Sequence, residues 1–146
     1  MQVPHNSFVL VADGKKLLFF RNEGDEAFPN LVIEKKQVHE NPDDGDQKTD
    51  AAGAHMGSTG VGTNAYGEAD FHQLEENRFA ADAADMLKKR ALNNDFDSLI
   101  VVAPPKTLGE LRKHYHKEVE KRIAGEISKD LTGHPVTEIE KLLIAE

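Results

Sequence analysis

The chain of 146 residues contains no cysteine, and this absence excludes disulfide bonds, thiol catalysis and metal sites with cysteine ligands. Long apolar runs are also missing, because no stretch approaches the roughly 18 residues that a membrane span requires. The opening segment, MQVPHNSFVLVADGKK, has no basic region ahead of its short apolar run, unlike a signal peptide. We therefore expect a cytoplasmic protein with no membrane partner, folded as a single domain over residues 1–146.

Positive charge is scarce, because 18 Lys and Arg residues stand against 26 Asp and Glu residues, for a net charge of −8. A protein built mainly to hold nucleic acid carries a positive footprint, so this total argues against that class. The charge is uneven, however. Residues 23–50 contain nine carboxylates and three lysines, whereas residues 104–122 contain six cations and three carboxylates. The acidic total hides one basic segment.

The N-terminal third predicts three antiparallel strands. Residues 8–12 (FVLVA) are typical of a buried strand, and the following Asp13-Gly14 pair is a strong hairpin signal. Residues 16–21 (KLLFFR) are the expected partner strand. Residues 31–38 (LVIEKKQV) are half polar and predict a third strand near the edge of the sheet.

Residues 40–69 are rich in glycine and show no apolar period. A segment of this length without regular structure is typical of a functional or disordered loop. We expect a flexible loop here, and its candidate residues are Gly57, Gly60, Gly62 and Gly67. The sequence GSTGVG at 57–62 resembles a phosphate-binding loop. It lacks the lysine after the last glycine, and no strand precedes it.

The rest of the chain predicts alternating helices and strands. A long helix is expected to start at a capping box of Asp70 with Gln73, and its apolar stripe consists of Phe79, Ala83, Met86, Leu87 and Ala91. Residues 99–103 (LIVVA) predict a strand buried on both faces.

A second helix is expected after Pro104-Pro105, with Thr107 as its N-cap and Glu110 closing a capping box. Its buried face consists of Leu108, Leu111, Tyr115 and Val119. Residues 123–129 predict a last strand, and Pro135 begins a last helix. The order βββ-α-β-α-β-α predicts an α/β fold of mixed α+β character, a five-stranded mixed sheet with helices on its faces.

No catalytic or metal-binding constellation emerges from the residues. His114 and His116 are two apart and point away from each other on a helix. Asp13 stands where a ribonuclease-H-type nuclease has its first carboxylate, but Pro104-Pro105 replace the later one, so Asp13 is better explained as a turn residue. There is no G-x-S-x-G motif. We expect no catalytic residue, no metal and no cofactor, and the sequence leans against an enzyme.

The basic segment is the candidate binding site for RNA or another partner. Its cations lie beside a helix N-terminus, which itself attracts anions. Ion pairs such as Lys117–Glu120 are the alternative, since they would make this a neutralised, solvated face. The candidate residues are Lys106, Arg112, Lys113, Lys117 and Lys121.

The blocks APPKTLGELRKH (103–114) and KDLTGHPVTEIEKLL (129–143) closely resemble the bacterial host attachment protein family. VADGKKLLFF (11–20) and FAADAADML (79–87) extend the resemblance over nearly the whole chain. That family is similar to the central domain of archaeal and eukaryotic peptide-chain release factors, which implies a ribonuclease-H-like mixed sheet. Release factors carry a Gly-Gly-Gln motif in the loop before the long helix. Residues 53–68 have no such motif, so peptide release by that chemistry is not expected.

Three functions follow as hypotheses. The first is a non-catalytic binding module that associates with RNA, the ribosome or a protein partner through the basic helix and the glycine-rich loop. The second is an adhesion or cell-surface interaction protein, as the family name suggests. The third is a hydrolase acting on RNA or peptidyl-RNA. The sequence leaves the oligomeric state open.

Overall fold

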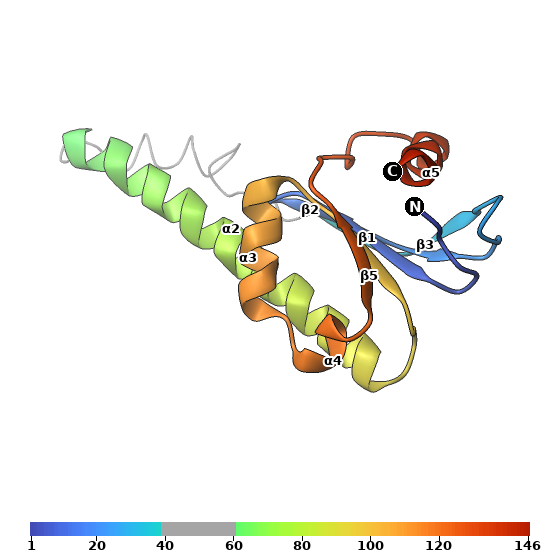
Figure 1. Cartoon of the computed structure of the whole chain (residues 1–146). Helices are drawn as coiled ribbons and strands as arrows, with labels where there is room; N and C mark the ends of the chain where they lie inside the picture. Colours follow the sequence, from blue (N-terminus) through green and yellow to red (C-terminus); the bar gives the residue numbers. More distant parts are fainter. Residues whose placement is uncertain (39–60) are drawn as a thin grey trace.

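The computed structural model describes residues 1–38 and 61–146, and the side chains of its long helix from Gln73 onward. It contains the five expected strands, labelled as in Figure 1: β1 (Phe8–Ala12), β2 (Lys16–Asn22), β3 (Leu31–Val38), β4 (Leu99–Val102) and β5 (Ile123–Ile127). The helices are α2 (Val61–Leu92), α3 (Pro105–His114), α4 (Lys117–Glu120) and α5 (Val136–Ala145). The predicted order of elements is confirmed, with α4 added.

The strands form one mixed sheet in the order β3-β2-β1-β4-β5. The first three strands pair antiparallel, whereas β4 runs parallel to both β1 and β5. The predicted five-stranded mixed sheet is therefore confirmed. β3 lies at the edge, as its half-polar pattern predicts, and every residue of β4 is buried.

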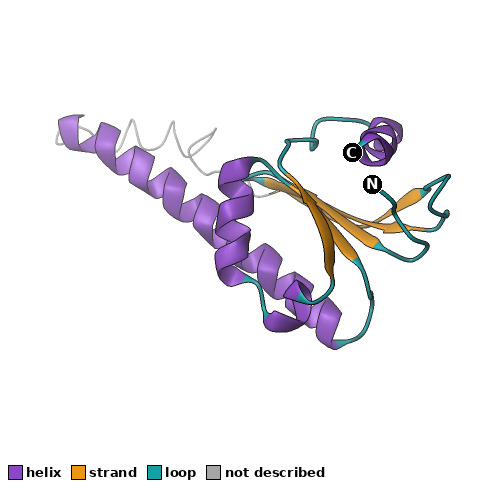
Figure 2. Ribbon diagram, in the orientation of Figure 1, coloured by secondary structure: helices purple, strands orange, loops and turns teal. Residues whose placement is uncertain are grey.

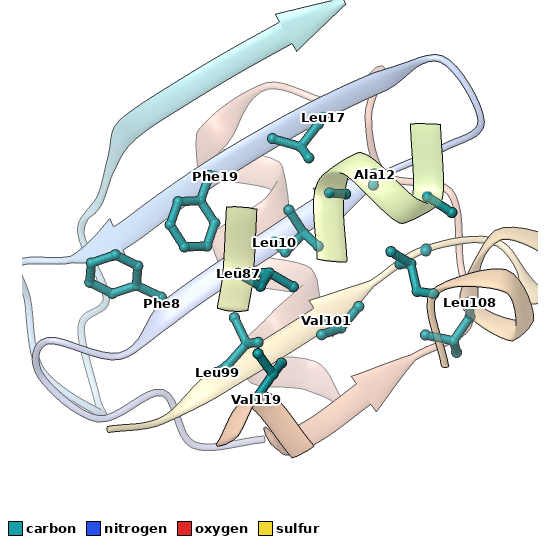
Figure 3. Close-up of a cluster of buried hydrophobic side chains, with 14 of the residues drawn as sticks. Phe8, Leu10, Ala12, Leu17, Phe19, Leu87, Leu99, Val101, Leu108 and Val119 are labelled. Atoms are coloured by element: carbon teal, nitrogen blue, oxygen red, sulfur yellow. The ribbon is translucent and has the colours of Figure 1, made fainter. Parts of the chain in front are cut away.

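Helices cover both faces of this sheet (Figure 2). Alternate residues of β1 point to opposite faces: Phe8 and Leu10 join the core beneath α2, α3 and α4, and Val9 joins the core beneath α5. Figure 3 shows the first of these cores, in which Leu87 of α2 lies over the strands. The rings of Phe8 and Phe19 meet edge to face, with centroids 4.9 Å apart.

The predicted start of the long helix at Asp70 is wrong, because α2 begins at Val61. No proline interrupts residues 61–92, and each residue added to an existing helix gains a backbone hydrogen bond. Gly62 and Gly67 are therefore helical positions, although each glycine disfavours a helix by about 1 kcal/mol relative to alanine. Gly57 and Gly60 lie outside the described residues.

The predicted basic helix is two helices. α3 starts at Pro105, whose fixed φ suits the first helical position, so Thr107 is not the N-cap and no side chain caps this end. Tyr115 is extended and ends α3. The Nδ1 atom of His116 then accepts a hydrogen bond from the backbone N–H of Glu118 (3.0 Å) and caps α4.

Candidate nucleic-acid interface

The five predicted basic residues all lie on α3, α4 and the residue that follows α4, outside the sheet. We call this set the α3–α4 surface: Lys106, Arg112, Lys113, Lys117 and Lys121. All five are exposed. The break at Tyr115 does not bury any of them, because Leu108, Leu111 and Val119 still face the core and Tyr115 packs against it.

Carboxylates neutralise most of this surface. The guanidinium of Arg112 donates to Glu126 of β5 through Nη2 (2.7 Å) and Nε (3.1 Å to Oε1). The other pairs are Lys113 with Glu110 (3.0 Å), Lys121 with Glu118 (3.0 Å) and Lys106 with Glu76 (3.8 Å).

Lys117 has no ion-pair partner among the described residues, so the predicted Lys117–Glu120 pair is not formed. Lys121, one turn further along, pairs with Glu118 instead.

Within two of these pairs, one partner favours the charged form of the other. The hydrogen bond from Lys121 lowers the pKa of Glu118, and the hydrogen bond to Glu126 raises the pKa of Arg112. These shifts favour the charged forms of Glu118 and Arg112. Exposed ion pairs of this kind contribute little to stability and are weakened by salt.

Arg122 is the sixth cation of residues 104–122 and does not belong to the α3–α4 surface. Its Nη1 donates to the carbonyl of Phe96 (2.6 Å), and its Nη2 donates to Asn94 Oδ1 (3.1 Å). These bonds fasten the end of α4 to the loop between α2 and β4. The contacts join segments 26 and 28 residues apart, so no local pattern in the sequence could have indicated them.

Burial raises the pKa of Tyr115, and the charge of Glu126 adds to this effect. The hydroxyl of Tyr115 is buried without a hydrogen-bond partner in the described part of the chain. This side chain therefore stays neutral and acts as an apolar anchor between α3 and α4.

Asp13, which follows the first strand as a nuclease carboxylate would, is a turn residue in the structure. Asp13 Oδ1 accepts hydrogen bonds from the backbone N–H groups of Lys15 (2.7 Å) and Lys16 (2.6 Å). Its Oδ2 lies 3.0 Å from the hydroxyl of Thr132, which can donate to it. Within residues 1–38 and 73–146, no three His, Asp or Glu side chains gather in a metal-binding arrangement.

This protein is a release-factor-like α/β domain. It has a mixed sheet covered by helices, and its sequence matches the model of a release-factor-like family. The chain belongs to bacterial archaeo-eukaryotic release factor family 12, whose model matches residues 6–143. The release-factor side of the predicted resemblance is thereby confirmed. The host attachment label stays a prediction.

Two further comparisons add little. No curated protein matches the chain. A solved structure described as "Archaeal protein" is similar to 95% of this chain, with 10% identity and a TM-score of 0.46. The chain spans 40% of the length of that protein. None of the described helices has the length and apolar character needed to span a membrane.

Proposed function

We propose that this protein is a translation-associated binding domain that contacts RNA, most directly ribosomal RNA, through the α3–α4 surface. The observation that carries the proposal is the family match, which spans residues 6–143. The surface adds a physical route, because its exposed cations stand on a chain whose net charge is −8. The acidic remainder repels RNA, so binding would be confined to this face.

The ion pairs of the surface predict weak and salt-sensitive association. A phosphate must compete with Glu110, Glu118 and Glu126 for Lys113, Lys121 and Arg112. Lys117 meets no such competition among the described residues and is the expected first contact. Such a surface suits a protein that engages and leaves the ribosome rather than one that stays bound.

The proposed function is binding without catalysis. The sequence contains no Gly-Gly-Gln motif. The glycine-rich segment that the sequence suggested as a second contact, with Gly57 and Gly60, lies outside the described residues. The proposed RNA contact is therefore assigned to helices α3 and α4 and not to the glycine-rich segment.

The test is binding to single-stranded RNA, followed by fluorescence anisotropy over a range of salt concentrations. The double variant Lys117→Glu with Lys121→Glu should bind more weakly and flatten the plot of log K against log salt by about 1.4, since each phosphate contact on a single strand contributes about 0.7. The matched control is Lys36→Glu with Lys141→Glu, which makes the same charge change on β3 and α5.

Cell lysate fractionated on a sucrose gradient provides the second readout. We expect the protein to sediment with ribosomes at low salt and to leave them as salt rises. The proposal is contradicted if the protein stays at the top of the gradient at low salt and binds RNA without any salt dependence.

A further inference from the structure

A cavity of about 720 Å³ opens at the end of the sheet where strands β1 and β4 begin and strand β2 ends. Its walls come from residues 4–8, from Arg21 of β2 and Glu34 of β3, from Arg90 near the end of α2, and from residues 94–98. The turn at Asp13, which connects β1 to β2, lies at the opposite end of these strands. Nothing in the function proposed above uses it.

Buried polar groups without partners gather around this cavity. The described residues contain four buried side-chain nitrogen or oxygen atoms that lack a hydrogen bond, and three of these belong to lining residues: Ser7 Oγ, Arg21 Nε and Arg90 Nε. Ser7 is 1% exposed. The Arg90 Nε atom lies 3.0 Å from Asp95 Oδ2, but without the geometry of a hydrogen bond. Buried polar groups are normally hydrogen-bonded. Because Arg90 Nε is ion-paired with Asp95, Ser7 Oγ and Arg21 Nε are the lining atoms in this group that have no polar partner.

The backbone around the cavity is unusual as well. Asn6 (φ 68°) and Asn94 (φ 58°) are the two described non-glycine residues with positive φ, and both line the cavity. Asparagine tolerates this left-handed conformation better than most residues. Such residues persist where the surrounding structure holds them. The side-chain oxygen of Asn94 accepts a hydrogen bond from the guanidinium of Arg122.

The charges of the walls select the chemistry of the ligand. The lining contains two arginines, Arg21 and Arg90, and three carboxylates, Glu34, Asp95 and Asp97. It therefore carries a slight negative excess that disfavours a free phosphate. Asp97 is exposed and has no partner among the described residues. The walls therefore offer donors and acceptors together, which suits an uncharged group with both.

Arg90 adds a flat surface. Its guanidinium lies over the rings of Phe8 (5.4 Å) and Phe19 (5.5 Å), and its Nη2 donates to Glu34 (3.0 Å). Guanidinium planes held in this way are platforms on which unpaired RNA bases stack.

We propose that this cavity binds an unpaired nucleobase, and guanine in preference to the other three. Guanine presents the acceptors O6 and N7, which arginine recognises, and its N–H groups can donate to a carboxylate such as Asp97. The choice of a base as the ligand rests on the proposed function. Arg122 connects the two sites, because it follows Lys121 of the α3–α4 surface and bonds to Asn94 and Phe96 at the cavity. A strand held on α4 would thus lie next to the cavity.

The experiment is a titration of the intact, isotope-labelled protein with guanosine, adenosine, cytidine and uridine, up to about 1 mM, followed by amide NMR. We expect saturable shifts at residues 6–8 and 94–98 that are largest with guanosine. Asp97→Asn should weaken guanosine binding at least fivefold, and Ser7→Ala should weaken it less. The matched control Asp82→Asn changes an exposed aspartate of α2 and should bind as the unmodified protein does.

The outcomes separate this inference from the proposed function. Guanosine binding that survives in the Lys117→Glu, Lys121→Glu double variant supports a separate base site. Guanosine binding by a protein that shows no affinity for RNA would uphold the cavity and overturn the proposed function. The inference is overturned if no nucleoside shifts the cavity amides, or if Asp97→Asn binds guanosine like the unmodified protein, even where RNA binding is intact.

Discussion

Removing the carboxylates of the α3–α4 surface should strengthen RNA binding. The triple variant Glu110→Gln, Glu118→Gln, Glu126→Gln takes away the partners of Lys113, Lys121 and Arg112, which lie 3.0, 3.0 and 2.7 Å from their cations. The cations stay in place on α3 and α4. A phosphate would then no longer compete with a carboxylate at three positions.

The size of the effect follows from the number of cations released. Each contact to a single-stranded phosphate adds about 0.7 to the salt slope, so three freed cations steepen it by up to about 2. Between about 50 and 200 mM salt, a slope steeper by 2 corresponds to a further loss of affinity of roughly sixteenfold. The gain over the unmodified protein is therefore greatest at low salt.

The control must change the net charge equally. Glu26→Gln, Asp82→Asn and Glu138→Gln together also remove three negative charges, but these exposed residues pair with no cation in the described part of the chain. RNA anisotropy is measured for both triple variants across the same salt range. Equal affinities and equal slopes for the two would refute the reasoning, because overall charge and not the local pairs would then govern binding.

Two further predictions concern the fold and its titration. Leu87→Ala, at a fully buried position of α2 in the core beneath the helices, should lower the free energy of unfolding by about 2–5 kcal/mol in urea denaturation; a loss below about 1 kcal/mol would contradict the packing. The pKa of Glu118 is lowered from its ordinary value of 4.5, chiefly by the hydrogen bond from Lys121. Its pair therefore stabilises the fold above that pH and loses this contribution as pH falls through the lowered pKa. Lys121→Gln should raise the Glu118 midpoint in a carboxyl NMR titration, and an unchanged midpoint would show that the pair does not form in solution.

Periodicity was enough to predict the sheet. β1 and β4 are short apolar runs between clear turn signals, and β3 alternates poorly because it lies at the edge. These are local properties of the chain. The helix ends were less predictable, since the Asp70 and Thr107 capping boxes are plausible starts that the chain does not use. At α3, the helix begins at Pro105, three residues earlier than it would with Thr107 as its N-cap.

The chemistry of the candidate sites was less visible in the sequence than the fold. The basic residues could be counted, but their neutralisation by Glu76 and Glu126 depends on α2 and β5 lying beside α3. The cavity could not have been predicted at all. Ser7, Arg21 and Arg90 come from separate elements, and none of them belongs to a motif.

A basic surface whose cations are ion-paired, next to a cavity that can admit a base, has a consequence for selectivity. Phosphates carry no sequence information, and the ion pairs keep their contribution small at physiological salt. A duplex offers phosphates but no free base, so it would gain only the weak part of the interaction. A single-stranded loop offers both, because an unpaired guanine could enter the cavity while its neighbours lie along α4. If both sites act together, unpaired G-rich loops should bind more tightly than duplexes of equal charge, and the Asp97→Asn variant should lose this preference while keeping its salt slope.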